Sequence, residues 1–306
     1  MDTAEQIRML QYAAKVAGLD ARETVLPADR QAIVGTMRFH YLDWGGTGYP
    51  ILFLHGGGLN AHTWDVVALM LHDGYRCIAL DQRGHGDSEW SPSIDYGVET
   101  QVRDVEGFID LLQLKKPVVI GQSMGGLNAM GYAARHSDSI AGLVIVDVGP
   151  EINQDGAERI RSFSSTPELD SLEEFLERAV KFNPHRDPEV LRRSLFYNLG
   201  QLPSGKWILK HDQRRGSEDA ARNEAQRERL AKEIAKISCP TLIVRGARSD
   251  ILSDEGAEKF ARSLPRARWV RVEDAGHNVH GDNPRGLLDA IYPFLSEIGL
   301  ESKGTE

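Results

Sequence analysis

After Pro27 the chain alternates short apolar runs with longer amphipathic stretches, and this alternation constrains its fold more than any other feature. The runs are rich in Val, Ile and Leu, as buried parallel strands are, and the stretches between them show helical spacing. This pattern predicts βαβ units and an α/β fold with a mostly parallel sheet. The runs interpreted as strands are Arg38–Asp43, Ile51–His55, Arg76–Asp81, Val118–Gly121, Leu143–Asp147, Thr241–Gly246 and Arg268–Val272. Helices are expected at about 4–18, Thr100–Leu114, Leu127–His136 and Pro284–Ile298.

The segment from about 151 to 237 breaks this alternation. It holds 16 basic and 16 acidic residues, so the remaining 20 basic and 29 acidic residues account for the whole formal charge of −9. A helical, charge-balanced insertion in a strand–helix protein predicts a cap over a functional site, the alternative being solvated surface helices without a role there. We therefore expect three parts: residues 1–150, the first part of the core with an N-terminal helical extension; 151–237, a helical cap; and 238–306, the second part of the core.

The sequence Gly121-Gln122-Ser123-Met124-Gly125 lies between a predicted strand and a predicted helix. This is the context in which a G-x-S-x-G motif forms a tight turn that exposes the serine hydroxyl at the sheet edge. Glycines are needed on both sides because side chains there would collide with neighbouring backbone. The motif alone arises often by chance, and an ordinary glycine-rich turn is its alternative. Ser123 is the candidate nucleophile.

A glycine run, His55-Gly56-Gly57-Gly58, follows the strand at Ile51–His55. Such a loop can aim a backbone N–H at an oxyanion, and the residue after the nucleophile supplies a second donor. We assign the two oxyanion amides to Gly57 and Met124, with Gly58 as the alternative to Gly57. A phosphate-binding loop is disfavoured because neither G-x-x-x-x-G-K-[ST] nor a G-x-G-x-x-G opening a helix is present here.

A serine nucleophile needs a base and an acid, in the chain order Ser…Asp/Glu…His for this motif. His277 follows the last predicted strand directly after Gly276 and is the candidate base, with His280 as its nearest competitor. Asp250, shortly after the strand Thr241–Gly246, is the candidate acid. Asp147, at the end of the preceding strand, and Asp254 are its competitors.

Together these motifs resemble the α/β-hydrolase superfamily, from about Arg38 to Leu300 with the predicted cap interposed. The resemblance implies an eight-stranded, mostly parallel sheet flanked by helices, a helical cap inserted after strand six, and no metal or organic cofactor. It also implies that the loop of residues 81–88 is structural and that residues 60–64 line the pocket entrance. Ser123 argues against epoxide hydrolases and haloalkane dehalogenases, which use a carboxylate nucleophile. Asn278 and Met124 depart from patterns common in C–C bond hydrolases and proline iminopeptidases.

The function predicted from these residues is hydrolysis of carboxylic esters or lactones of small, largely apolar substrates through an acyl-enzyme. The residues expected to bind the substrate are Gly58, Trp64, Phe196 and Trp207. A C–C bond or amide hydrolase with the same triad, and a non-catalytic receptor for a small ligand on the same fold, are the alternatives.

The remaining features of the sequence bear on partners and location. An acidic balance argues against a nucleic-acid binder, and the two cysteines, Cys77 and Cys239, cannot form a disulfide framework. No apolar stretch reaches the roughly 18–20 residues of a membrane span, and the N-terminus does not resemble a secretory signal. We expect a cytoplasmic protein with a small-molecule partner and neither nucleic acid nor membrane as partner, and we leave a homodimer open.

Overall fold

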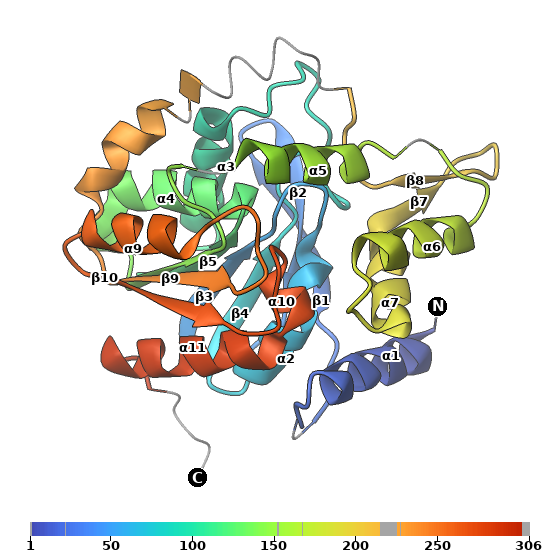
Figure 1. The fold of residues 1–306 in the computed structure, drawn as a ribbon, viewed down its shortest axis with the longest axis horizontal. Helices are drawn as coiled ribbons and strands as arrows, with labels where there is room; N and C mark the ends of the chain where they lie inside the picture. Colours follow the sequence, from blue (N-terminus) through green and yellow to red (C-terminus); the bar gives the residue numbers. More distant parts are fainter. Residues whose placement is uncertain are drawn as a thin grey trace.

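The computed structural model describes residues 2–301 except 22, 152, 167, 215–224 and 227. Its centre is an eight-stranded sheet in the order β1-β2-β4-β3-β5-β6-β9-β10, in which every neighbouring pair from β4 to β10 is parallel. The predicted α/β fold with a mostly parallel sheet is therefore confirmed (Figure 1). The strands are β1 (Ala28–Val34), β2 (Met37–Asp43), β3 (Tyr49–Leu54), β4 (Tyr75–Leu80), β5 (Val118–Gln122), β6 (Gly142–Val146), β9 (Thr241–Gly246) and β10 (Ala267–Val272).

The strand β1 is the one member of this sheet that the sequence pattern did not reveal. It forms an antiparallel hairpin with β2, across a turn that contains Gly35 in the left-handed region at φ 60°. β1 lies at the edge of the sheet, and Ala32 is its one buried residue. An edge strand that buries so little shows no apolar run, because most of its side chains face water.

Helices cover both faces of the sheet, and each face has its own apolar core (Figure 1). One core includes buried residues of α3, α4 and α9, such as Phe108, Met130 and Phe260. The other includes buried residues of α1, α2 and α11, such as Leu10, Leu69 and Ile291. The expected helices are confirmed with small shifts at their ends. The bounds are α1 (Thr3–Val16), α2 (Asp65–Leu71), α3 (Val98–Leu111), α4 (Met124–His136), α9 (Asp254–Arg262), α10 (Val279–Asp282) and α11 (Pro284–Glu297).

Between β6 and β9 the chain leaves the sheet and forms the segment predicted as a cap; its residues 215–224 lie outside the described part of the chain. The described part includes the helices α5 (Gln154–Ser164), α6 (Leu172–Phe182) and α7 (Pro188–Asn198), further helical residues at 228–233 and the 3-10 helix η3 (Ile234–Lys236). It also includes a small hairpin, β7 (Leu199–Gln201) with β8 (Trp207–Leu209). The segment has its own apolar cluster, centred on Phe175, Leu191 and Leu195. The hairpin is an addition to the helical cap that we predicted, and its three-residue strands are too short to stand out in the sequence.

Buried polar contacts join this segment to the core. Arg193 of α7 forms an ion pair with Asp65 of α2, and both side chains are almost completely buried. Beside them the rings of His62 and Tyr197 stack with centroids 3.6 Å apart. The N-terminal helix α1 packs on α7 as well, where the Tyr12 hydroxyl donates a hydrogen bond to Asp187 Oδ2 over 3.1 Å.

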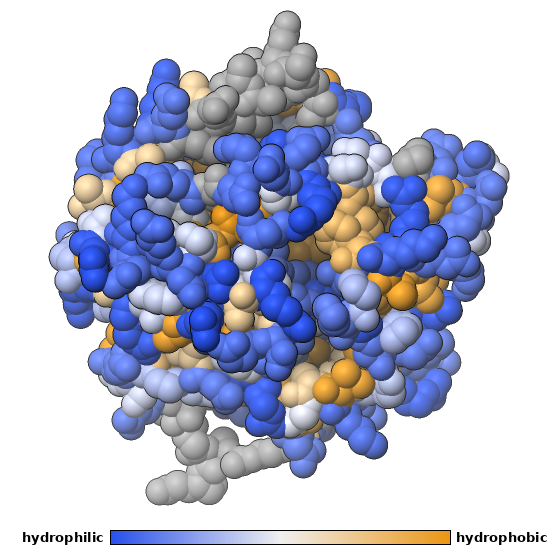
Figure 2. Space-filling model, in the orientation of Figure 1, coloured by the Kyte–Doolittle hydropathy of each residue, from blue (hydrophilic) through white to orange (hydrophobic). Residues whose placement is uncertain are grey.

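The surface in Figure 2 is mostly hydrophilic, but it is hollowed beneath α5, and hydrophobic residues gather beside this hollow towards α6 and α7. Phe163 of α5 and Phe182 of α6 stack with ring centroids 4.3 Å apart, and Phe182 is 37% exposed. In the described part of the chain no helix has the length and apolarity that crossing a membrane requires. Both cysteines, Cys77 and Cys239, are buried and free.

Candidate active site

Ser123 occupies the sharp turn that the sequence predicted. It lies between the last residue of β5, Gln122, and the first residue of α4, Met124, with φ 51° and ψ −117°. This left-handed backbone is unfavourable for a residue with a side chain and costs roughly 1–3 kcal/mol. The flanking glycines make the turn sterically feasible, since a Cβ on Gly121 would overlap the carbonyl oxygen of Gly125. A Cβ on Gly125 would lie 2.6 Å from the carbonyl oxygen of His55.

Two hydrogen bonds tie this turn to the neighbouring loops at the carboxyl edge of the sheet. The Ser123 amide donates to the carbonyl of Val146, the last residue of β6, over 3.1 Å. The Gln122 side-chain amide donates to the carbonyl of His277 over 3.0 Å. One main-chain and one side-chain hydrogen bond therefore hold together the candidate nucleophile, the end of β6 and the loop of the candidate base.

His277 lies in the loop after β10, as predicted, and its ring is held by a carboxylate. Its Nδ1 lies 2.8 Å from Oδ2 of Asp147, and its side chain is 15% exposed. The backbone before it is fixed as well, because the Gly276 amide donates to Asp282 Oδ2 over 2.9 Å. Asp282 in turn accepts hydrogen bonds from Arg186 of the cap segment.

Asp147 directly follows β6 and is completely buried, with a left-handed backbone at φ 54°. Its Oδ1 accepts a hydrogen bond from the Gly246 amide over 3.0 Å, and its Oδ2 accepts from the Ser249 hydroxyl in addition to His277. An ionised carboxylate only accepts hydrogen bonds, so the Nδ1 of His277 must carry the proton in this arrangement. In a neutral imidazole this leaves Nε2 unprotonated and able to accept a proton.

The prediction that Asp250 orients the histidine is wrong in this structure, and its competitor Asp147 takes that place. Asp250 instead forms an ion pair with Arg159 of α5, and a third of its side chain is exposed. The reason is the course of the loop after β9, which points Ser249 towards Asp147 and the next side chain towards the cap segment. Asp254, the other competitor, opens α9 and pairs with Arg245.

His280, the competitor for the base, has a structural environment. It is buried, its Nε2 lies 2.8 Å from the Thr63 hydroxyl, and its ring stacks on Trp64 at 4.2 Å. Burial lowers the pKa of His280 well below the usual value, with a further contribution from the nearby charge of Arg186. His280 is therefore neutral, and its contacts with Thr63 and Trp64 fix the segment that follows His277.

The glycine loop after β3 lies against the serine turn. A Cβ on Gly56 would be 3.4 Å from the Cβ of Ser123, and one on Gly57 would be 3.9 Å from the sulfur of Met124. His55 anchors the loop, since its Nε2 accepts from the Gln82 amide over 2.9 Å while its Nδ1 lies 2.8 Å from the Gly56 carbonyl. Burial lowers the pKa of His55, so its ring is neutral and holds the loop without adding charge. The assignment of the oxyanion amides to Gly57 and Met124 stays a prediction that fits this packing.

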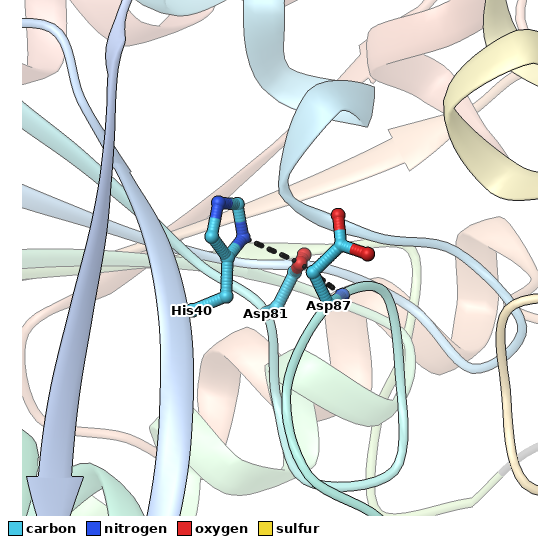
Figure 3. A group of neighbouring side chains, drawn as sticks. All are labelled: His40, Asp81 and Asp87. Atoms are coloured by element: carbon cyan, nitrogen blue, oxygen red, sulfur yellow. Dashed lines mark hydrogen bonds and ion pairs between the residues drawn. The ribbon is translucent and has the colours of Figure 1, made fainter.

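Figure 3 shows a second cluster of titratable groups, His40, Asp81 and Asp87, whose possible ligand atoms lie within 4.8 Å of one another. The oxygens of Asp81 are already occupied: Oδ1 accepts from the Ala61 amide over 2.6 Å, and Oδ2 accepts from the Asp87 amide and lies 2.8 Å from His40 Nδ1. Burial opposes the charged form of both partners, but their pairing still raises the pKa of His40 and lowers that of Asp81. These contacts explain the cluster as an ion pair that braces the loop after β4.

The four residues predicted to bind substrate have different environments. Gly58 has φ 77° and faces the cap segment, since a Cβ there would lie 2.9 Å from the hydroxyl of Ser164. Trp64 is fully buried beneath His280, so the prediction that it lines the pocket is wrong. Phe196 is half-buried on α7, and Trp207 packs against the apolar cluster of the cap segment.

Comparisons with known proteins identify the family of the chain. The family model described as the α/β hydrolase fold matches residues 49–284. The chain belongs to this family. An esterase from Mycobacterium tuberculosis is 34% identical over 262 residues, which are 83% of this chain and 85% of the relative. A solved structure of an esterase from that organism aligns with a TM-score of 0.77 at 30% identity. The alignment covers 97% of this chain and 99% of the esterase chain.

Two further relatives of the family act on other substrates. A mouse sn-1-specific diacylglycerol lipase is 29% identical, with 85% of each chain covered. A 2-(acetamidomethylene)succinate hydrolase from Mesorhizobium japonicum is 26% identical, with 82% of this chain and 89% of the relative covered. The predicted family is thus confirmed, and the predicted class, an ester hydrolase, is that of the esterase and the lipase among these relatives.

The sequence reasoning missed residues that act through hydrogen bonds rather than by motif. Ser249 contacts the Asp147 carboxylate, and Gln82 joins the glycine loop to Asn128 of α4 over 2.6 Å. Asp147 had a partial signal, since it directly follows a strand, but Asp250 also follows one, so this signal named both as candidates without choosing between them. Ser249 had none, because a serine beside an aspartate in a loop has many ordinary explanations.

Proposed function

We propose that this protein is a serine hydrolase that cleaves carboxylic esters or lactones through an acyl-enzyme. The observation that carries the proposal is the pair formed by His277 and the buried Asp147, 2.8 Å apart, beside a serine turn held to both of their loops. A serine hydroxyl is a weak nucleophile unless a base removes its proton. The inferred tautomer of His277 leaves Nε2 free for this task.

The catalytic steps follow from these roles. Ser123 attacks the carbonyl carbon while His277 takes the hydroxyl proton, and the buried charge of Asp147 stabilises the imidazolium that results. The amides of Gly57 and Met124 would hold the oxyanion, where one such donor typically contributes roughly 3–4 kcal/mol. His277 then protonates the leaving alcohol. Water next attacks the acyl-enzyme while His277 takes its proton, and His277 returns a proton to Ser123 as the acid is released.

The environment of the site supports a largely apolar substrate. The hollow beneath α5 is bordered by hydrophobic residues (Figure 2), and the stacked rings of Phe163 and Phe182 lie on the helices beside it. Gly58 meets the cap segment at Ser164, which brings that segment next to the glycine loop. The esterase and lipase relatives support an ester as the bond that is cleaved, because both names denote ester hydrolysis.

Amide hydrolysis is the second candidate, and one relative favours it. The name of the Mesorhizobium enzyme denotes hydrolysis of a compound with an acetamido group, and its chain aligns over 82% of this one. The same three side chains could serve either bond, because acyl transfer from an amide differs mainly in the leaving group that His277 must protonate.

Hydrolysis of p-nitrophenyl esters of graded acyl length, with a lactone and an acetanilide in parallel, tests the proposal. We expect turnover of the esters by the wild type, loss of that turnover in Ser123→Ala, and wild-type rates in Ser263→Ala, a matched change of an exposed serine at the end of α9. A fluorophosphonate should phosphonylate Ser123 with loss of fluoride, which adds the mass of the phosphonyl group to the peptide that contains Ser123. Full activity of Ser123→Ala, or a wild type that binds small molecules but turns over no ester, lactone or amide, would refute the proposal.

A further inference from the structure

The loop after β9 places one more side chain beside the candidate triad, and the family motif does not specify this residue. Ser249 lies three residues beyond the end of that strand, is 9% exposed, and directs its hydroxyl at Asp147 Oδ2, the oxygen that also faces His277. The same hydroxyl oxygen accepts a hydrogen bond from the Ile251 amide over 3.1 Å. A hydroxyl has a single proton, so with the amide occupying a lone pair the proton is directed at the carboxylate.

The position of Ser249 is fixed by its surroundings rather than by its own side chain. Arg245, the fifth residue of β9, donates to three carbonyls of this loop: Leu252 at 2.8 Å, Ala247 at 3.0 Å and Ser249 at 3.3 Å. The Ser249 amide donates back to Gly246 over 2.9 Å. A loop bound at so many points presents its hydroxyl with little rotational freedom, as preorganisation of a site requires.

The chemistry of the contact gives the hydroxyl two effects on the histidine. Its hydrogen bond keeps the Asp147 carboxylate from rotating, which preserves the geometry of the bond to Nδ1. It also withdraws part of the negative charge from the oxygen that stabilises the imidazolium, because a hydrogen bond to a charged group stabilises and delocalises that charge. We infer that Ser249 is a positioning residue of the catalytic triad, which sets both the orientation of Asp147 and the proton affinity of His277. This inference rests on the proposed function.

The other charged groups near this dyad are paired elsewhere and stay constant in the test. His280 is buried and neutral, Asp250 is paired with Arg159, and Asp282 is paired with Arg186. The guanidinium of Arg245 is paired with Asp254. His55, whose pKa burial lowers, lies in the glycine loop on the other side of the serine turn.

The test compares Ser249→Ala with Ser253→Ala in the full-length protein. Ser253 is the N-cap of α9, where its hydroxyl accepts from the Gly256 amide over 3.0 Å, so its loss weakens the same region of the chain without altering the dyad. For Ser249→Ala we expect kcat/KM to fall on the order of tenfold. We also expect the midpoint of the acidic limb of its pH profile to move to higher pH, because Asp147 regains charge that favours the imidazolium. Ser253→Ala should lower thermal stability and leave that midpoint unchanged.

Two further measurements keep the inference falsifiable if Ser249→Ala is poorly folded. Ser249→Thr retains the hydroxyl and should restore the wild-type midpoint, whereas Ser249→Cys, a weaker donor, should fall between Thr and Ala. The downfield proton resonance of His277 Nδ1 reports the same titration without turnover. A Ser249→Ala profile whose midpoint stays at the wild-type pH or moves lower would overturn the inference. Wild-type activity of Asp147→Asn would instead refute the triad of the proposed function, so the two failures are distinguishable.

Discussion

Replacement of Asp147 by asparagine should nearly abolish activity, and the structure allows the size of the loss to be worked out. The carboxylate accepts three hydrogen bonds, from Gly246, Ser249 and His277. An asparagine has one oxygen to offer, so its NH2 group must face either the Gly246 amide or the histidine. If it faces the histidine, the imidazole must move its proton to Nε2, where it can no longer accept the proton of Ser123.

The wrong tautomer lowers kcat by about 10³–10⁴ in comparable triads, which corresponds to roughly 4–5.5 kcal/mol in the transition state. If the NH2 group faces the Gly246 amide instead, two buried donors oppose each other, at a cost of about 1–3 kcal/mol in stability. Asp250→Asn is the matched control. It removes an ion pair with Arg159 whose acidic partner is one-third exposed, which contributes at most about 1 kcal/mol, so kcat should change by less than tenfold.

Initial rates with a p-nitrophenyl ester at pH 7–8, together with thermal unfolding followed by circular dichroism, decide the question. We expect Asp147→Asn to be folded and almost inactive, and Asp250→Asn to be folded and active. If instead Asp250→Asn loses the larger factor, the acid belongs on the loop after β9, and the reasoning from the hydrogen bond to His277 is refuted.

Further outcomes follow from packing and burial. Gly125→Ala should prevent the serine turn from forming, because a Cβ there overlaps the carbonyl oxygen of Leu54; a soluble, active variant would contradict this. His280→Gln should keep kcat within about tenfold of the wild type. Because burial lowers the pKa of His280, its contribution to stability is present above about pH 6.5 and is lost as pH falls further, so urea denaturation of the variant should show a weaker loss in acid. Arg193→Met removes one partner of the buried carboxylate of Asp65 and leaves its Oδ2 with His62, whose Nδ1 lies 2.9 Å away. The free energy of unfolding should therefore fall by at most about 3–5 kcal/mol, and an unchanged urea midpoint would argue against a buried charge there.

Much of the fold and site could be predicted from the sequence, because glycines and apolar periodicity act locally. The serine turn depends on Gly121 and Gly125, whose contacts are set by neighbouring backbone, and the motif encodes those contacts directly. The same holds for the buried parallel strands, whose side chains are apolar on both faces. His277 could be proposed as the base for a related reason, since it follows a glycine in the loop after the last strand.

The acid could not be chosen from the sequence, because β6 and β9 are neighbours and their ends emerge at the same edge of the sheet. Asp147 and Asp250 both follow these strands, so chain order and strand ends favour neither. What separates them is the path of the loop 247–253, which brings the Ser249 hydroxyl to Asp147, and such a path depends on contacts between residues far apart in the chain. Trp64 illustrates the same limit, since a tryptophan beside a pocket and one beneath it look alike in sequence.

The insertion between β6 and β9 has a consequence for how the protein is made. The two strands pair in parallel register, Leu143 with Thr241, although almost a hundred residues separate them. Asp147 leaves the ribosome just before this excursion, and its partners follow only after it, at Gly246, Ser249 and finally His277. A nascent chain that ends before the loop after β10 thus contains the candidate nucleophile without its candidate base. On the proposed triad, hydrolysis requires that β10, which precedes His277, has joined the sheet.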